Sequence, residues 1–426
     1  MKKIIIVSPH FPPSNLAAVH RSRLFAKHLP FFGWEPIILT VHHKFYEEAP
    51  DWNLNKLVSE SLKVEKVSAL PVKPVRLLGD IGLRGGLNLF AKLLSLVKKE
   101  QPDFIYIPIP SFYAALLGRA IHAVTGVPYG IDYIDPWVHF FPGSEKRFSR
   151  HWWSTKFAAY LEPIAVKHAK LITGVAEGYY LPVLERNLHL KKRSVQAYMP
   201  YGGEKEDHIA LKKLNLRPYL FDKKRGKHIF VYAGAMLPKA YKPLDCILQV
   251  IQENEAYFNN TEFHFIGTGK TPNDPEGYNI KDYAIEYNLW EKVIYEYPKR
   301  IPYLDVLTHL NVADGVFVLG STEPHYTPSK VYQGILSEKP VFAVLHEKSS
   351  ASKVIVESNA GIVLNFAGES DINTIKTTFL QKIKEYQQFA NDFDPAQVDH
   401  SAFELYSALN VTKVLAEHLD MAIDKK

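Results

Sequence analysis

The chain has 426 residues, of which 46% are hydrophobic, 13% aromatic and 23% charged. This length predicts two or three domains, and the composition excludes a disordered or low-complexity protein. The net charge is +6, and the single cysteine, Cys246, excludes an internal disulfide framework and a four-cysteine zinc site and fits a reducing compartment.

The positive charge is concentrated in the first half of the chain. Residues 1–220 hold 30 Lys and Arg against 18 Asp and Glu, whereas residues 221–426 hold 21 against 27. A basic half of this kind can face anionic lipid, nucleic acid, a phosphorylated substrate or only solvent. Nucleic acid is disfavoured, because the charge is scattered and no module of interleaved aromatic and basic residues is present. Peripheral contact with an anionic membrane and an ordinary solvated surface both remain open.

The first elements predict a parallel sheet. A buried strand at 4–7 is followed by a proline-rich turn at 8–15, an amphipathic helix at about 17–29 and a second apolar run at 36–41. The first strand is too short for the apolar core of a signal peptide. No segment reaches the roughly 18–20 apolar residues that span a bilayer. We therefore expect a cytoplasmic protein.

Short apolar runs alternate with helical stretches along the rest of the chain. In the first half the runs are 104–107, 129–132 and 171–173, and the helical stretches are 86–98, 112–123 and 155–168. In the second half the expected strands are 228–233, 261–266, 292–295, 315–319, 340–344 and 361–364. Such alternation is typical of parallel sheets covered by helices. The sequence therefore predicts an α/β fold of two Rossmann-like doubly wound domains that face a cleft.

The expected domain boundaries follow from composition. We predict a first domain at 1–205, a polar linker at 206–227 and a second domain at 228–395. The remaining segment, 396–426, is expected to be a helix that can pack back on the first domain. Ser401 and Glu404 form a capping-box pattern at its start.

The loop after the first strand is a candidate acceptor or phosphate loop. It reads Pro-Pro-Ser14-Asn15 and lacks the G-x-G-x-x-G pattern of dinucleotide-binding proteins. Ser14, Asn15 and Arg21 still supply donors at the start of a helix, which suits an anionic group. An ordinary proline-stiffened turn is the alternative.

A second candidate follows the strand near residue 132. Asp132, Asp135, Trp137 and His139 crowd the mouth of this strand, where ligands bind in open α/β sheets. Asp135 is the candidate for acid–base work or for binding a sugar hydroxyl. The alternative is a helix cap at Asp135 with Trp137 in the core.

Three stretches of the second half supply candidate donor-binding residues. A strand ends at Gly234, and Lys239 and Lys242 follow it; such lysines can bring an ammonium to a diphosphate. The second strand of that half ends at a glycine pair, Gly267 and Gly269, which lets backbone approach a ligand closely.

The third stretch starts a helix. Ser329 and Lys330 stand in its first turn, a geometry that binds phosphate. Tyr332 and Gln333 follow on the same helix and complete the candidate donor site.

In this order, the stretches resemble the GT-B glycosyltransferases, in particular the retaining family 4, which uses nucleotide-sugar donors. The resemblance covers nearly the whole chain. It implies that Lys242, with Lys239 as the alternative, contacts the donor pyrophosphate, and that Ser329 and Lys330 lie beside the nucleotide.

The sequence departs from that family at three positions. The two glutamates that the family carries seven residues apart are replaced by His325 and Gln333, and the family arginine beside Gly234 is replaced by Ala235. Glutamine can still hydrogen-bond a ribose hydroxyl. The replaced glutamates also favour the alternative of a nucleotide-sugar-binding protein that has lost catalysis.

No metal or other cofactor is expected. The Asp-x-Asp pattern at Asp392 and Asp394 lies in a polar connection far from any strand end, where a loop or cap is the simpler interpretation.

The function that we predict is transfer of a sugar, with retention and without metal, from a nucleotide diphosphate sugar to an acceptor. The acceptor would be a glycan or a lipid-linked molecule of polysaccharide biosynthesis, held by the basic first domain. Lys242 and Lys330 would offset charge on the diphosphate, and Asp135 would orient the reacting groups. A sugar-nucleotide epimerase of the same fold is a further alternative.

Overall fold

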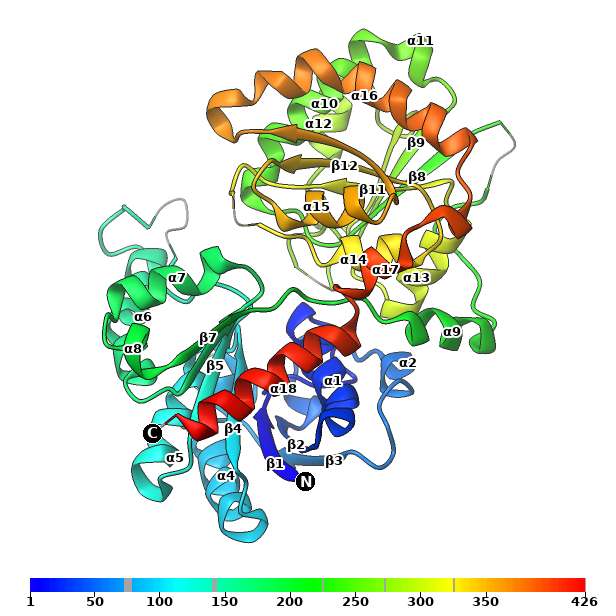
Figure 1. Cartoon of the computed structure of the whole chain (residues 1–426). Coiled ribbons are helices and arrows are strands. Elements are labelled where there is room, and N and C mark those ends of the chain that lie inside the picture. Colours follow the sequence, from blue (N-terminus) through cyan, green and yellow to red (C-terminus); the bar gives the residue numbers. More distant parts are fainter. Residues whose placement is uncertain (73–78, 140–143, 224–225, 272, 325, 426) are drawn as a thin grey trace. The chain divides into compact units, whose positions relative to one another are not determined.

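The computed structural model divides the chain into two compact units (Figure 1). The first unit comprises residues 1–201 and 408–426, and the second comprises residues 202–407. The structure describes the whole chain apart from 73–78, 140–143, 224–225, 272, 325 and 426.

The first unit is built on a seven-stranded, wholly parallel sheet in the order β3-β2-β1-β4-β5-β6-β7. The strands are β1 (Lys2–Val7), β2 (Trp34–Val41), β3 (Lys63–Val67), β4 (Phe104–Ile109), β5 (Tyr129–Tyr133), β6 (Leu171–Gly174) and β7 (Val195–Tyr198). The helices are α1 (Ala17–His28), α2 (Trp52–Asn55), α3 (Ile81–Arg84), α4 (Gly86–Glu100), α5 (Ala115–Thr125), α6 (Arg150–Val166), α7 (Glu177–Arg186), α8 (Leu190–Arg193) and α18 (Ala408–Asp424).

Both faces of this sheet are buried, which is why its strands are continuous apolar runs. Ile5 and Val7 point into the core on the side of α4 and α5. Ile4 and Ile6 point to the other side, where they pack with residues of α1 and α18. The last helix is also held by Asp420, which accepts hydrogen bonds from Lys2 Nζ at 2.8 Å and Trp34 Nε1 at 3.1 Å.

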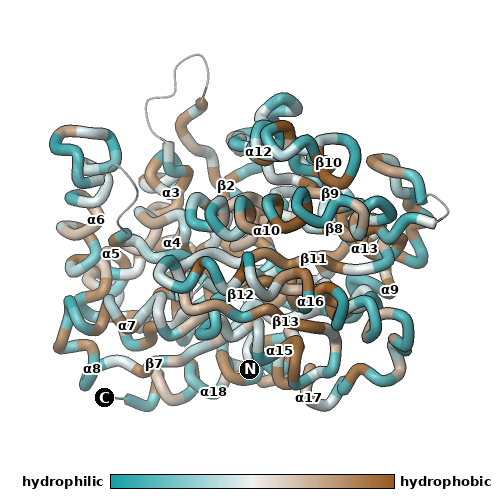
Figure 2. Tube along the Cα trace, turned by 90° about the horizontal axis from the view of Figure 1, so that it is seen from above, coloured by the Kyte–Doolittle hydropathy of each residue, from teal (hydrophilic) through white to brown (hydrophobic). Residues whose placement is uncertain are grey.

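The second unit contains a six-stranded parallel sheet in the order β10-β9-β8-β11-β12-β13. The strands are β8 (His228–Ala233), β9 (Thr261–Ile266), β10 (Ile294–Tyr297), β11 (Gly315–Leu319), β12 (Val341–His346) and β13 (Gly361–Phe366). Figure 2 shows hydrophobic residues along β11, β12 and β13. The helices are α9 (Lys205–Leu214), α10 (Tyr241–Glu253), α11 (Glu255–Phe258), α12 (Lys281–Glu286), α13 (Tyr303–Val312), α14 (Lys330–Leu336), α15 (Ser350–Glu357), α16 (Asn373–Asn391) and α17 (His400–Glu404).

Two features differ from the sequence-based expectations. Helix α9 occupies residues 206–214 of the segment 206–227 that the polar composition predicted as a linker. The segment 396–426 forms two helices, α17 and α18, which belong to different units. Asp399, which accepts from Ser401 N and Ala402 N, caps α17, so the capping-box prediction at Ser401 is wrong.

Among the described residues, no helix is both long and apolar enough to cross a membrane.

Candidate functional site

The carboxyl ends of β8 and β11 form the switch point of the second sheet. These strands are neighbours, and the sheet grows outward from them in both directions. Ligands of open α/β sheets bind in the crevice that such a reversal creates. Gly234 follows β8, and the segment after β11 leads to Lys330 at the start of α14.

The ammonium of Lys330 is buried at this point. Although the residue as a whole is partly exposed, Nζ is inaccessible and has no hydrogen-bond partner among the described residues. Nζ lies 3.4 Å from the centroid of the Tyr232 ring, over its face. Burial lowers the pKa of Lys330 well below its ordinary value. The switch point therefore holds a buried lysine amine that has no anionic partner among the described residues.

Gly234 provides the room for this side chain. Its φ is +133°, and a Cβ atom at this position would lie 3.3 Å from both Cε and Nζ of Lys330. A side chain here would be strained by the backbone and would crowd the ammonium. The structure thus brings two of the predicted donor-binding residues, Gly234 and Lys330, into contact.

The two lysines that follow β8 have different surroundings. Lys239 Nζ pairs with Glu323 at 3.1 Å, and its carbonyl accepts from Thr322 N, so it lies against the segment that follows β11. Lys242 Nζ pairs with Glu369 at 3.2 Å and lines a pocket of about 430 Å³ over α10. Lys239, rather than Lys242, is therefore attached to the segment that continues to Lys330.

The glycine pair after β9 is held by a buried carboxylate. Glu296, in β10, accepts hydrogen bonds from Thr268 Oγ1 at 2.6 Å and from the amides of Asn279, Ile280 and Lys281, each at 2.9 Å. Gly267 has a φ of +73°. A Cβ at Gly269 would lie 2.6 Å from the carbonyl oxygen of Pro298, so only glycine fits.

The remaining predicted residues at the start of α14 have different surroundings. Ser329 precedes α14 and makes no capping hydrogen bond with its side chain. Tyr332 is fully buried, with its ring 6.3 Å from that of Tyr406. Gln333 Oε1 lies 2.9 Å from Nε2 of His208 on α9, so this amide is already engaged. His325 lies outside the described residues.

In the first unit, Arg21 is a buried structural charge. Its Nε and Nη2 bond to the Asp132 carboxylate, the latter at 3.1 Å, and its Nη1 donates to the carbonyl of Pro200 at 2.7 Å. Burial lowers the pKa of Arg21, but Asp132 outweighs this effect and raises it. Thr173 Oγ1 also donates to Asp132, at 2.8 Å. Arg21 therefore fixes the ends of distant segments and is not open to solvent.

Ser14 and Asn15 lie in the loop between β1 and α1, which begins without a side-chain cap. The buried Ser14 hydroxyl donates to Glu48, which is also 2.9 Å from Nδ1 of His10. Burial raises the pKa of Glu48, but the hydrogen bonds and charge from His10, together with Ser14, lower it to about 2. The group formed by His10, Ser14 and Glu48 lies beyond the carboxyl end of β1.

Asp135 follows β5 and is exposed to solvent, without a hydrogen-bond partner among the described residues. The crowded surroundings raise the pKa of this carboxyl to about 6, a shift that water at its exposed side moderates. Trp137 is buried and its ring lies 6.1 Å from Phe112. No described helix begins at Asp135, so the predicted helix cap is absent. The other part of that alternative, Trp137 in the core, is confirmed.

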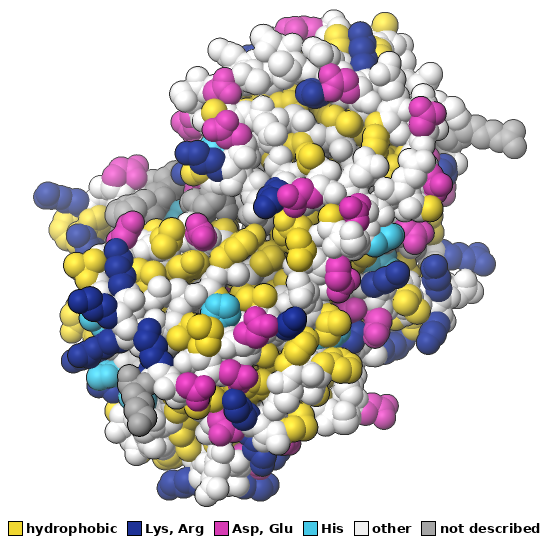
Figure 3. All heavy atoms as spheres, viewed as in Figure 1, with side chains coloured by type: hydrophobic (Ala, Val, Ile, Leu, Met, Phe, Trp, Pro, Cys, Tyr) yellow, Lys and Arg dark blue, Asp and Glu magenta, His cyan; other side chains and the backbone are white. Residues whose placement is uncertain are grey.

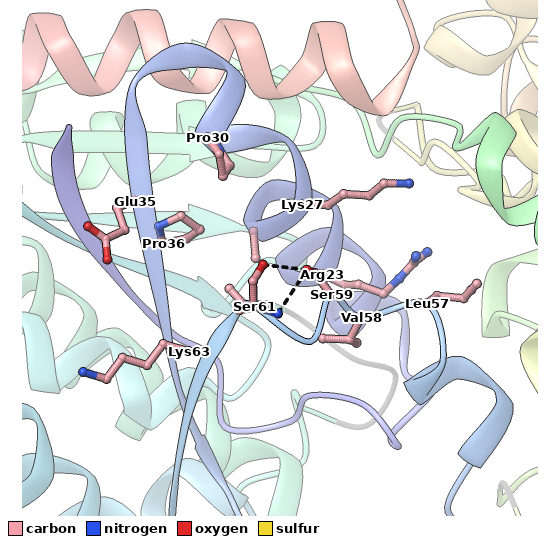
Figure 4. Close-up of a pocket in the computed structure, with 12 residues that line it drawn as sticks. Arg23, Lys27, Pro30, Glu35, Pro36, Leu57, Val58, Ser59, Ser61 and Lys63 are labelled. Carbon is pink, nitrogen blue, oxygen red and sulfur yellow. Dashed lines mark hydrogen bonds between the residues drawn. The ribbon is translucent and has the colours of Figure 1, made fainter.

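A pocket of about 260 Å³ lies at the opposite edge of the first sheet (Figure 4). Arg23, Lys27, Glu35 and Lys63 are among its lining residues, and the last two stand at the amino ends of β2 and β3. None of the predicted site residues lines this pocket.

The structure gives the Asp-x-Asp pattern a local role. Asp394 accepts a hydrogen bond from Ala396 N at 2.9 Å and caps a short helical turn, and Asp392 ends α16. Within the described part of the chain, no group of three or more His, Cys, Asp or Glu side chains is arranged to hold a metal ion.

Sequence reasoning missed Tyr232, Glu296 and His208. Glu296 carries a weak signal, because it is a charged residue within an otherwise apolar strand. Tyr232 and His208 carry none, since each acquires its role only from a residue that lies far away in the chain.

No family model and no curated protein matches the sequence. Solved structures do match the fold. A glycosyltransferase from Rickettsia africae is 14% identical with a TM-score of 0.62, covering 100% of this chain and 99% of its own. A sucrose-phosphate synthase from Thermosynechococcus elongatus is 13% identical with a TM-score of 0.63, covering 100% of both chains. HepE of Anabaena in complex with UDP-glucose is 13% identical with a TM-score of 0.62, covering 99% of this chain and 100% of its own.

The chain has the GT-B fold. Each unit is a Rossmann-like domain with helices on both faces of a parallel sheet, as the sequence predicted. At these identities the likeness concerns the fold, and the function must be argued from the site.

Proposed function

We propose that the protein is a glycosyltransferase that takes a sugar from a nucleotide diphosphate sugar, with the diphosphate bound at the switch point of the second unit. The observation that carries this proposal is the buried Lys330 ammonium, which has no anionic partner among the described residues. A buried charge of this kind is costly unless a ligand completes its interactions.

A diphosphate is the ligand that this arrangement suits. Gly234 places no side chain against Nζ, and Lys239 reaches the same segment through its pair with Glu323. During transfer the bond between the sugar anomeric carbon and the diphosphate oxygen breaks, and a bond to the acceptor oxygen forms. The negative charge that develops on the leaving diphosphate is stabilised by a nearby, already positioned ammonium.

Uridine diphosphate is the donor class to test first. HepE, whose fold is similar, has been solved with UDP-glucose and with UDP, and MnaA of S. aureus, at a TM-score of 0.52, with UDP. The resemblance of the motifs to family 4 supports retention, a metal-independent reaction in the cytoplasm and a role in polysaccharide biosynthesis.

We assign the acceptor, a glycan or a lipid-linked molecule, to the first unit. Asp135 is exposed just after β5 and has no hydrogen-bond partner among the described residues, so its carboxylate can accept a hydrogen bond from a sugar or acceptor hydroxyl. The partial desolvation that raises the pKa of Asp135 to about 6 keeps it near the pH at which proton exchange is efficient.

The test is thermal unfolding of the purified chain with UDP, GDP, ADP, TDP and CMP. One diphosphate should raise the melting temperature of the wild type and of the control Lys213→Met, an exposed lysine of α9, and should raise that of Lys330→Met much less. Lys239→Met and Lys242→Met, measured in the same way, decide which of these lysines contacts the diphosphate. If no nucleotide shifts the wild type, the proposal is wrong.

Turnover separates the two alternatives of the same fold. A donor that is converted to its epimer with no acceptor present identifies an epimerase. Binding of the nucleotide without any turnover identifies a protein that has lost catalysis, an outcome that the engaged amide of Gln333 would then explain.

A further inference from the structure

The outward face of α6 carries a stripe of large apolar side chains. Trp153, Phe157, Tyr160 and Ile164 follow one another at helical spacing and are 45%, 52%, 70% and 42% exposed. Side chains three and four residues apart lie on one face of a helix, so the four form a continuous surface. A contiguous exposed apolar surface of this kind usually marks an interaction site.

The opposite face of α6 is firmly anchored, so the stripe cannot turn inward. Ala158, Glu162 and Ala165 are buried, and the helix packs against α5. The Glu162 carboxylate accepts hydrogen bonds from Arg186 of α7 at 2.9 and 3.0 Å. Tyr129 of the sheet donates to the carbonyl of Ala165 at 2.6 Å.

An aromatic cluster extends the stripe beyond the start of the helix. Phe148 is 74% exposed, and its ring lies 5.6 Å from Trp152 and 6.4 Å from Trp153. The Trp153 ring is in turn 5.9 Å from Phe157. Phe148 has a φ of +62°, a strained conformation for a bulky residue, which presents this ring to solvent. Four aromatic rings therefore adjoin on one exposed surface.

Basic residues surround the stripe. In the described segment 144–168 the exposed charged side chains are Lys146, Arg147, Arg150, Lys156 and Lys167 against one acid, Glu145, because Glu162 is buried and paired. Lys156 Nζ lies 5.6 Å from the centroid of the Trp152 ring, next to the aromatic cluster. Figure 3 shows Lys and Arg side chains interleaved with hydrophobic ones over the part of the first unit formed by α6 to α8.

We propose that this face, residues 146–167, docks on a membrane surface that contains anionic lipid. Trp and Tyr rings favour the boundary between headgroups and acyl chains, and the surrounding lysines and arginines bind anionic headgroups. A second copy of the chain is the less suitable occupant, because docking two such faces would bring like charges together. The inference does not depend on the chemistry of the donor site.

Vesicle binding of the full chain tests the proposal. Wild-type protein should sediment with vesicles of phosphatidylcholine and phosphatidylglycerol, less with phosphatidylcholine alone, and less at high salt. Replacing Trp153, Phe157 and Tyr160 together with Ser should weaken binding by about 100-fold or more, since most of the inserted apolar area is lost. The matched control replaces two exposed apolar residues outside α6, Phe31 and Leu87, with Ser and should bind as wild type.

Charge reversal tests the basic rim separately. Lys146→Glu with Arg150→Glu should weaken binding to anionic vesicles by about 25-fold or more, roughly fivefold for each basic side chain lost. The same change at the exposed residues Lys98 and Lys99 of α4 is the control. The melting temperature of each variant with and without UDP reports whether the fold and the donor site are intact.

Three outcomes would overturn the proposal. In the first, the wild type fails to bind vesicles. In the second, the wild type binds, but the stripe variant and the control variant bind equally well. In the third, the wild type forms a dimer and binds no vesicles, and the stripe variant is a monomer. None of these outcomes touches the donor site, whose failure would appear instead as a missing nucleotide response in the wild type.

Discussion

Replacing Lys330 with Met gives the sharpest prediction, because one change should affect stability and binding in opposite directions. Methionine is similar in length and apolar, so it fills the space beside Gly234 and Tyr232 without a charge to desolvate. An unpartnered buried ammonium costs several kcal/mol, or is held neutral at the corresponding cost in pKa. The cation–π contact with the face of Tyr232 offsets about 2 kcal/mol of this desolvation cost.

The net effect on the ligand-free protein should be a gain of at least about 1 kcal/mol for Lys330→Met. For a domain of this size, this gain corresponds to a melting temperature higher by about 2–4 °C. The diphosphate, by contrast, loses a charge-assisted hydrogen bond of about 1.5–3 kcal/mol, so that UDP affinity falls by about 10- to 150-fold.

The pH dependence checks the cause. The pKa of Lys330 in the folded protein lies well below its ordinary value of 10.5, so the unfolded chain binds the proton more readily. Wild-type stability should therefore rise with pH between the lowered pKa and about 10.5, and the advantage of Lys330→Met should shrink over the same interval.

Calorimetry completes the assay. If UDP restores the charge of Lys330, binding takes up protons in the wild type, and titrations in buffers of different ionisation enthalpy measure this uptake. Lys330→Met should show none from this group. A variant that melts lower than the wild type and binds UDP unchanged would refute the reasoning.

The remaining predictions concern three carboxylates and one arginine. If the charged form of Asp135 orients the reacting groups, the transfer rate should rise as pH increases through about 6. Asp135→Asn should abolish this rise and lower the transfer rate by about 10²- to 10⁴-fold, and an unchanged pH–rate profile would exclude the role. Glu296→Gln should lower the melting temperature of the second unit by about 4–12 °C, through loss of about 2–3 kcal/mol of charge-assisted hydrogen bonds, whereas the exposed Glu286→Gln should leave it unchanged; equal melting of the two would contradict the capping role. Arg21→Met and Asp132→Asn should each cost about 3–5 kcal/mol in urea unfolding, and the double variant should cost less than their sum; additive costs would show that the two residues do not act as a pair.

Local sequence was enough to predict most of the strands. The apolar runs at 4–7, 104–107 and 315–319 lie inside strands of the structure, because a strand buried on both faces must be apolar at successive positions. The alternation with helices predicted two parallel sheets for the same reason. The glycines after β8 and β9 could also be recognised, since their backbone conformations tolerate few other residues.

The partners of charged side chains could not be predicted in this way. Nothing local distinguishes Lys239 from Lys242, yet one pairs with the segment after β11 and the other with Glu369. Arg21 was predicted to meet an anionic ligand, and its guanidinium instead bonds to Asp132, 111 residues further along the chain. Such pairs depend on which strands become neighbours.

The sequence by itself determined that this protein is two doubly wound α/β domains with glycines and lysines at strand ends, because periodicity and backbone freedom are local properties. Only the tertiary structure decided that the Lys330 ammonium is buried over Tyr232 beside Gly234, and that the aromatic stripe of α6 remains outside the core. Burial and charge pairing are set by residues distant in the chain, so they appear only once the sheets have formed.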